Sequence, residues 1–406
     1  MHFNPAQETR RRKRPMAKAL AIASVFCLPA GSPIAAEKPA PKAGAAQAAH
    51  LLERVTVCPL DKKHKWNGCG AVTAAGGVIL YSWYTGGPGE PHSENRVEIS
   101  RSFDRGRTWE SPQVIADPPG PVRAADPMLW RDEKGSVHLT YGVWDPAKSK
   151  QVGEWTFYHC ICVNPKAKGE TLRWTKPVEM APHRKLDVFF NNKPIRLQSG
   201  EWIMPVVVRN GKRPDKDSPY HWGFESAGAL ISIDGGKTWN IAGTSPRIAN
   251  SGYGQKDTFC WEAGAFQRKD GTVVIFVRNS WGLIQATEST DRGKTWNEFQ
   301  PVNVPNPTAR IHVRKLPGGE VICLSNPNSK PGSENRTPLA AFISYDDGIS
   351  FAKIVILDVN GRVMYPDAEL DEDGHTLHLH YESRKEVFYS SLDTRNVLDP
   401  PRGYTR

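Results

Sequence analysis

One eight-residue phrase recurs along this chain and constrains its fold more than any other feature. It reads SFDRGRTW at residues 102–109, SIDGGKTW at 232–239, STDRGKTW at 289–296 and, in an altered form, SYDDGISF at 344–351. Successive copies begin 130, 57 and 55 residues apart. A period in this range is typical of solenoids, propellers and other arrays, in which each copy marks one structural unit.

The first interval is about twice the other two, so we infer that one copy has eroded. The segment LRWTKPVEMA at 172–181 marks its place, because it echoes RTWESPQVIA at 107–116. In each unit a strand precedes the phrase, another follows it, and a DG-type turn then joins two alternating runs, as in QRKDGTVVIFV. About four strands in each of about six units predict an all-β fold, a six-bladed β-propeller whose ring protects its strand edges. A β-sandwich is the alternative, but it does not explain the fixed period.

The residue types within the phrase predict a fixed turn. Its Asp accepts hydrogen bonds from backbone N–H groups of the turn, and the Gly two residues later permits a positive φ. The Trp is expected to bury about 200 Å² between neighbouring sheets. The fourth copy replaces Thr-Trp with Ser350 and Phe351, which keeps an aromatic plug. We therefore predict that the aspartates of the phrase stabilise the fold and are not catalytic.

The first 36 residues have the layout of an export signal. RRRKRPMAK is a basic region, ALAIASVFCLPA is an apolar core too short to span a bilayer, and GSPIAA ends in the small residues of a cleavage site. We predict a signal peptide at 1–36, a disordered Pro/Ala linker at 37–52 and the propeller at 53–400, in a secreted or periplasmic protein. Without residues 1–36 the net charge falls from +10 to +5, which is too small to indicate a nucleic-acid partner.

Six cysteines follow the predicted signal, and an even number in an exported chain permits disulfides. Cys58 with Cys69 is the best local candidate for a pair. Cys160 and Cys162 alternate on one strand face and are poorly placed to bond each other. We expect at least two of the six to be buried free thiols. There is no CxxC pair and no constellation of metal ligands, so the sequence predicts neither a metal nor another cofactor.

The repeated phrase matches the Asp box, S-x-D-x-G-x-T-W, and over about residues 55–395 the chain resembles the sialidase (neuraminidase) superfamily. This resemblance implies a propeller with a glycosidase site. Sialic acid carries a carboxylate on its anomeric carbon, which would repel a carboxylate nucleophile, and sialidases use a tyrosine instead. A phenol with a pKa of about 10 needs a neighbouring base such as Glu. A carboxylic acid must protonate the leaving oxygen, and arginines must hold the substrate carboxylate.

Three segments resemble the corresponding sialidase segments. WEAGAFQRKDGTVVIFVRNSWG implies that Glu262 is the base paired with the tyrosine and that Arg278 binds the carboxylate. MYPDAELDEDGHTLHLHYE implies that Tyr365 is the nucleophile. SNPNSKPGSENRTPLAAFISYDDG implies that Arg336 is a second carboxylate-binding arginine, with Arg310 in TARIHV as the alternative.

Two further segments complete the implied pocket. AADPMLW resembles the Asp-Pro stretch that lines it, which makes Asp126 a substrate contact with Arg123 nearby. Sialidases place the acid, an Asp, in the loop before the first box. That loop is TGGPGEPHSENRVEISRS here and has no Asp, so Glu90 is the predicted acid and Glu94 the alternative.

The chain departs from the family at one corner of the pocket. Sialidases begin with an Arg-Ile-Pro triplet whose Arg completes a three-arginine clamp, but here the stretch is KWNGCGAVTAAGGVILYSWY. Asn67 or a neighbour takes the place of that arginine, and Arg96 is a candidate to compensate. A lost bidentate arginine contact costs about 1.5–3 kcal/mol, which weakens carboxylate binding by about tenfold to a hundredfold.

The resemblance therefore implies a monomeric, sialidase-like exo-glycosidase that hydrolyses a terminal, acidic sugar from a glycan through a tyrosine nucleophile. Two alternatives from other classes are a non-catalytic carbohydrate-binding propeller and a polysaccharide lyase. A lyase would use tyrosine with a histidine, for which His92, His312 and His380 are available. No later stretch of the sequence reads as a membrane span.

Overall fold

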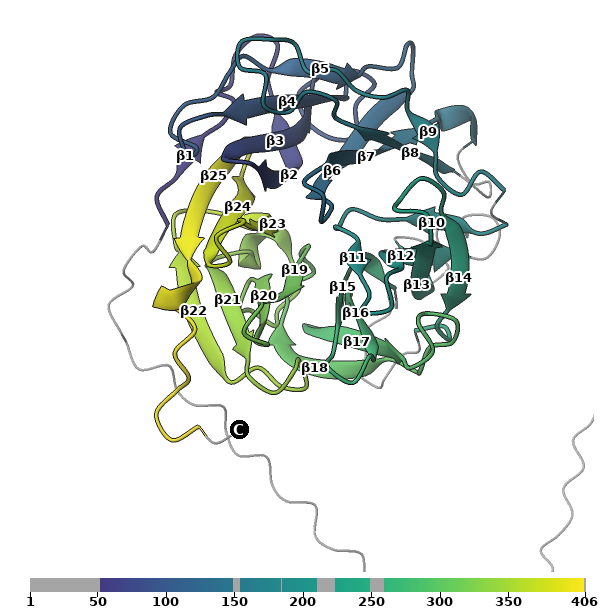
Figure 1. Cartoon of the computed structure of the whole chain (residues 1–406), viewed down its shortest axis with the longest axis vertical. Coiled ribbons are helices and arrows are strands. Elements are labelled where there is room, and N and C mark those ends of the chain that lie inside the picture. The colour runs from purple at the N-terminus through teal and green to yellow at the C-terminus, as the bar shows by residue number, and fades with distance from the viewer. Residues whose placement is uncertain (1–51, 149–153, 184, 210–222, 249–258, 405–406) are drawn as a thin grey trace, which may run out of the picture. The chain divides into compact units, whose positions relative to one another are not determined.

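The strands form six small antiparallel sheets around a common axis (Figure 1). A computed structural model describes residues 52–148, 154–183, 185–209, 223–248 and 259–404. Over these residues, five sheets have four strands and one has five. The predicted six-bladed β-propeller is confirmed, and the β-sandwich alternative is wrong, because the repeat closes into a ring and not into two stacked layers.

In five of the sheets the first strand along the chain lies nearest the axis and later strands lie further out, whereas in the last sheet β23 is innermost and β1 outermost. The first three sheets contain β2 (Asn67–Ala75), β3 (Val78–Thr85), β4 (Arg96–Ser102) and β5 (Gln113–Ala116); β6 (Arg123–Arg131), β7 (Val137–Trp144), β8 (Trp155–Ile161) and β9 (Val178–Glu179); and β10 (Asp187–Phe189), β11 (Ile195–Arg196), β12 (Trp202–Arg209), β13 (Ser226–Ser232) and β14 (Asn240–Thr244). The last three contain β15 (Trp261–Gln267), β16 (Val273–Arg278), β17 (Leu283–Ser289) and β18 (Gln300–Pro305); β19 (His312–Lys315), β20 (Val321–Ser325), β21 (Leu339–Ser344) and β22 (Lys353–Asp358); and β23 (Met364–Leu370), β24 (Thr376–Ser383), β25 (Glu386–Asp393) and β1 (Val55–Thr56). Three short 3-10 turns are η1 (Pro146–Lys148), η2 (Ser333–Asn335) and η3 (Thr394–Asn396).

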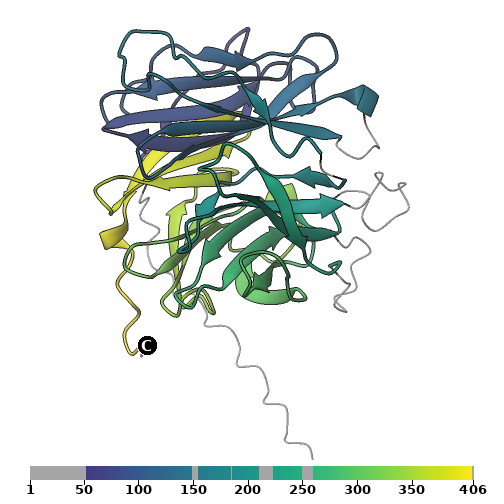
Figure 2. The same cartoon turned by 45° about the vertical axis from the view of Figure 1, so that its right-hand side comes forward.

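The ring closes by pairing the two ends of the propeller. β1 is the outer strand of the last sheet and pairs antiparallel with β25, with Val55 opposite Tyr389. Both views show the yellow β25 beside the purple first strands (Figures 1 and 2). Closure removes the free edges that an open array of sheets would leave.

The four Asp boxes each connect the last two strands of their sheet in chain order, and all adopt the same turn. The last sheet has no box. In the first box, Asp104 accepts hydrogen bonds from the Thr108 amide at 2.9 Å and the Thr108 hydroxyl at 2.6 Å. These hydrogen bonds lower the pKa of Asp104 to about 2. In the altered fourth box, Ser350 donates the same two bonds to Asp346. The second sheet has no box between β8 and β9, which is where the eroded copy was predicted.

The box glycine gives a stability prediction. Gly106 has φ 82°, and a Cβ there would lie 1.9 Å from Cε1 of Tyr389. We expect Gly106→Ala to lower the free energy of unfolding by about 3 kcal/mol, from backbone strain plus overpacking. Urea unfolding measures this loss. Gly235→Ala is the matched control: φ is 75° with no atom within 4 Å of the added Cβ, and the same position in the first box is Arg105 at φ 62°. Its expected loss is within about 1 kcal/mol, and equal losses would contradict the steric account.

All six cysteines in the described residues are buried and free, so the predicted pairing of Cys58 with Cys69 is wrong. Cys58 packs with Val72 and Trp83 near the ring closure, whereas Cys69 packs in a different cluster. The two thiols thus face different layers of apolar side chains although they are close in sequence. Cys160 and Cys162 do not bond each other, as expected, and the expectation of buried free thiols is confirmed.

The predicted signal peptide and linker lie outside the described residues, apart from Leu52. None of the helical turns in the part of the chain that the structure describes could cross a bilayer.

Candidate active site at the axial pocket

A pocket of about 470 Å³ lies where several of the inner strands begin. The residues that line it come from different sheets and from the loop before β4. Six of the residues singled out from the sequence are among them: Glu90, Arg123, Asp126, Glu262, Arg278 and Tyr365. The ring therefore brings together side chains that are up to 275 positions apart in the chain, from Glu90 to Tyr365.

Four inner strands present one side chain each to this pocket through the same irregularity. Cys69 of β2, Asp126 of β6, Glu262 of β15 and Tyr365 of β23 have φ values of 42°, 50°, 48° and 54°. At each of them the pairing with the next strand shifts register, as at a β-bulge. Left-handed backbone at residues other than glycine costs about 1–3 kcal/mol each and is found where a side chain must be re-aimed. The sheets therefore hold these four side chains in strained, fixed positions.

Arg278 joins the predicted base to the predicted nucleophile. Its Nη1 donates to Glu262 Oε2 at 2.7 Å and to the Tyr365 hydroxyl at 3.4 Å. Asn191 Nδ2 donates to the other Glu262 oxygen at 3.3 Å. Burial raises the pKa of Tyr365 well above its usual value, although Arg278 and Arg336 oppose the rise. The phenol is thus protonated at neutral pH and needs a base to react.

Arg336 lies against Tyr365 and Arg310 does not, and neither is among the residues that line the pocket. The Arg336 guanidinium lies 5.1 Å from the centre of the Tyr365 ring, and its Nη2 donates to the Thr308 carbonyl at 2.7 Å. Arg310 is fully buried and donates to the Gly70 carbonyl at 3.3 Å. The structure therefore places Arg336, and not its alternative, beside the predicted nucleophile.

Three carboxyl groups gather around Cys69. Glu382 of β24 accepts a 2.6 Å hydrogen bond from the Cys69 amide. Burial, and then the charge of Glu90, raises the pKa of Glu382 to about 8. Burial, and then nearby carboxylates, raises the pKa of Asp126 to about 7 and that of Glu90 to about 7. Glu90 keeps an exposed surface at the pocket mouth, so water screens part of the effect there. Over the described residues, no three His, Cys, Asp or Glu side chains are arranged to hold a metal.

Aromatic rings form another wall of the pocket, next to Arg123. The Arg123 guanidinium lies 4.3 Å from the Trp144 ring centre and 5.7 Å from that of Trp155. Trp155 contacts Phe189, which in turn contacts Trp261 at 4.8 Å between ring centres. Stacked aromatic and cationic groups of this kind offer an apolar face to a sugar ring.

Asn67 and Arg96 were the candidates to stand in for the arginine of the missing Arg-Ile-Pro triplet, and neither of them lines the pocket. Asn67 is buried and donates to the Cys58 carbonyl at 3.0 Å, so Cys69 and not Asn67 faces the pocket. Arg96 pairs with Glu98 at 2.7 Å in a neighbouring groove and does not compensate. Glu94, the alternative acid, lies in that same groove, whereas Glu90 lines the pocket.

The histidines that a lyase would need do not line the pocket. His312 and His380 are buried near the axis, where His380 accepts a hydrogen bond from the Gly70 amide at 3.0 Å. His92 lies in the loop before β4 and contacts the Glu94 amide at 3.2 Å. None of the three is among the pocket residues that the structure describes, which weakens the lyase alternative.

Sequence reasoning missed Cys69, Glu382, Asn191 and Trp155 as members of this site. A sequence signal marks three of the four bulges: Cys69 is followed by Gly, and Asp126 and Tyr365 are followed by Pro, whereas Glu262 is followed by Ala263. Proline and glycine interrupt regular strand pairing, so they indicate a bulge. Glu382 has no such signal, because its position depends on how the last sheet meets the first.

Comparisons with known proteins agree with this fold. Residues 78–380 match the family model described as a BNR repeat-like domain. A search of curated proteins found no match. A solved structure of a protein from Dyadobacter fermentans, titled as of unknown function, is 18% identical with a TM-score of 0.65 and covers 84% of this chain and 98% of its own.

Two sialidases are similar in structure. The NanB sialidase of Streptococcus pneumoniae, solved as the K499G mutant, has 13% identity and a TM-score of 0.63, over 84% of this chain and 71% of its own. The Trypanosoma rangeli sialidase in complex with sialic acid has 16% identity and a TM-score of 0.60, over 84% of this chain and 58% of its own. At these identities the likeness concerns the fold.

Proposed function

The chain belongs to the BNR repeat-like domain family, and from this premise we propose that it is an exported, sialidase-like exo-glycosidase with a tyrosine nucleophile. The observation that carries the proposal is the contact of Arg278 with both Glu262 and Tyr365 inside one pocket. The anomeric carbon of a sialidase substrate carries a carboxylate. Nucleophilic attack on that carbon requires a phenol, a carboxylate base and a guanidinium in contact, and these are the three groups present.

The proposed first step starts when a substrate carboxylate reaches Arg278. The guanidinium turns one N–H from Glu262 to the substrate, which leaves Glu262 Oε2 free to accept the phenol proton. The Tyr365 oxygen then bonds to the anomeric carbon as the bond to the leaving oxygen breaks. The pair with Arg278 holds Glu262 next to the phenol, where it can act as the base.

Glu90 supplies the proton to the leaving oxygen in this proposal. In the second step the ionised Glu90 accepts a proton from water, and the water oxygen replaces the Tyr365 oxygen at the anomeric carbon. Glu262 returns the proton to the phenolate. The exposed position of Glu90 at the pocket mouth fits this role, because both the leaving group and the incoming water must pass there.

The substrate class follows from the cations that face Tyr365. Arg278 and Arg336 lie beside the phenol and are the proposed partners of a carboxylate on a terminal sugar. A panel of sialosides and uronic-acid glycans tests this: release of the terminal acidic sugar is expected from at least one member. If the pure protein releases no sugar from any member, the enzyme proposal is lost.

The proposed acid gives a pH prediction. Glu90 must be protonated to donate, and its pKa is raised to about 7 by burial and by the nearby Asp126 and Glu262. We therefore expect kcat/KM to fall about tenfold per unit as pH rises above about 7. Initial rates across a pH series measure this. Glu90→Gln should abolish this fall of kcat/KM at high pH. It should lower the rate most for substrates with poor leaving groups. If only Asp126→Asn abolishes the fall, Asp126 is the acid.

A non-catalytic glycan-binding propeller is the second candidate, and the Cys69 corner favours it. Cys69 and Glu382 stand where a third arginine would complete the clamp. This candidate predicts saturable binding of an acidic glycan, measured by calorimetry, with no release of sugar over long incubation.

A further inference from the structure

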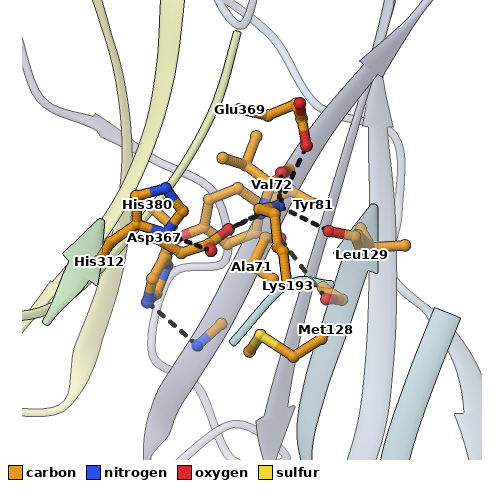
Figure 3. A network of polar contacts seen from close by, with 12 residues as sticks. Ala71, Val72, Tyr81, Met128, Leu129, Lys193, His312, Asp367, Glu369 and His380 are labelled. Carbon is orange, nitrogen blue, oxygen red and sulfur yellow. Dashed lines mark hydrogen bonds and ion pairs between the residues drawn. The ribbon is translucent and has the colours of Figure 1, made fainter. Parts of the chain in front are cut away.

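A buried cluster of polar side chains lies between the inner strands, further along them than the bulge residues that line the pocket (Figure 3). At its centre is Lys193, which follows β10 and is only 7% exposed. Its ammonium donates to the Val72 carbonyl at 2.5 Å and to the Leu129 carbonyl at 2.6 Å, and it pairs with Asp367 at 2.9 Å. An ammonium has three donors, and these three partners use all of them, while Glu369 of β23 lies 3.6 Å away as a second carboxylate.

The three partners of Lys193 lie on three of the four bulged strands. Val72 is on β2, Leu129 on β6 and Asp367 on β23. Each stands two or three residues after the strand's bulge residue, which is Cys69, Asp126 or Tyr365. The same segment reaches the fourth bulged strand as well, because Asn191, two residues before Lys193, donates to Glu262 at 3.3 Å.

Charge neutralisation alone does not account for this arrangement. Asp367 is fully buried, and it already accepts the Val72 amide at 3.0 Å and lies 3.3 Å from His312. A lysine that served only to neutralise Asp367 would not need two backbone carbonyls from other sheets. The carbonyl contacts also connect β2 and β6 to β23, three inner strands that belong to different sheets and do not pair with one another among the described residues.

We propose that Lys193 is a positioning residue for the axial pocket: one ammonium ties β2, β6 and β23 together just below their bulges, and so sets the spacing of Asp126 and Tyr365. This inference rests on the proposed glycosidase function for its kinetic consequence, but its geometric claim stands apart from it. Lys193 touches no reacting atom in the proposed mechanism, so it acts through the strands.

The kinetic test compares two variants that each remove the nearest cationic partner of a buried aspartate. Lys193→Met removes the axial contact, and Arg54→Met removes a pair with the buried Asp358, made at 2.6 Å on β22 away from the pocket. Both should lower the midpoint of thermal unfolding. We expect only Lys193→Met to lower kcat, by about tenfold to a hundredfold, with KM changed less than about threefold, because small misplacement of reacting groups acts mainly on kcat.

If Lys193→Met does not fold, the double variant Lys193→Met/Asp367→Asn also removes the charge of Asp367 but still lacks the ties to Val72 and Leu129. It should show the same loss of kcat. An unchanged kcat in either folded variant, or an equal loss in Arg54→Met, overturns the proposal.

A second readout does not depend on catalysis. The Cys69 thiol lines the pocket on the bulge of β2 and is only 4% exposed. Releasing β2 should speed its alkylation by iodoacetamide, by about tenfold or more, in Lys193→Met but not in Arg54→Met, as in local opening. Cys69→Ser identifies the labelled site by mass spectrometry. If the wild type hydrolyses no glycan, the glycosidase proposal fails, while this rate still decides the role of Lys193: equal rates in both variants overturn it.

Discussion

Tyr365→Phe is expected to lower kcat by at least about 10³-fold, the largest effect of any single substitution in this protein. The change removes one oxygen atom and leaves the ring that packs against Arg336, so the fold and the pocket should persist. If Tyr365 bonds to the anomeric carbon, no other pocket group can replace that oxygen. Initial rates on the substrate that wild type cleaves best measure the loss, and thermal unfolding shows that the variant is folded.

The control for this experiment is Tyr141→Phe, which removes a buried phenol of β7 outside the pocket and should leave kcat unchanged. Retained hydrolysis in Tyr365→Phe would contradict the assigned nucleophile. Turnover that instead produces the ultraviolet absorbance of an unsaturated sugar would identify a lyase and overturn hydrolysis altogether.

Glu262→Gln is expected to lower kcat by about 10²- to 10⁴-fold, the range in which general bases contribute. The amide cannot take the phenol proton, and burial keeps the pKa of Tyr365 too high for spontaneous ionisation at neutral pH. The substitution also leaves the buried Arg278 without its carboxylate, which should cost about 3 kcal/mol of stability. Kinetics and urea unfolding on the same preparation separate the two losses.

Glu201→Gln is the matched control, because Glu201 pairs at 2.9 Å with Arg292 at the ring's exposed outer edge. Pairs of that kind contribute about 0–1 kcal/mol, so both readouts should stay near the wild type. If Glu262→Gln loses stability but keeps its rate, Glu262 is only the partner of Arg278, and the proposed base is wrong.

The fold could be predicted from the sequence because the Asp box is local. Its Ser, Asp, Gly and Thr form one turn within eight residues, so its spacing reports the number of sheets directly. Glu262, Arg278 and Tyr365 could be placed because each lies at a fixed distance from a hairpin that the sequence marks. Their meeting in one pocket then follows from closure of the ring.

What escaped prediction depends on contacts between distant sheets. Whether Asn67 or Cys69 faces the pocket is decided by a bulge that shifts the register of β2, and a shift of one residue reverses every side chain beyond it. Glu382 and Lys193 matter because of neighbours contributed by other sheets. The mistaken pairing of Cys58 with Cys69 has the same origin, since closeness along the chain did not mean a shared face.

The strand β1 that seals the last sheet is among the first parts of the propeller to leave the ribosome, and its partner β25 is among the last. Until the final blade arrives, the earliest strand has no place to dock, and Tyr365 has no settled position opposite Glu262. The proposed activity would therefore be the last property that this polypeptide acquires during its biogenesis. We expect a chain truncated before β25 to have no hydrolytic activity at all, and not merely a reduced activity.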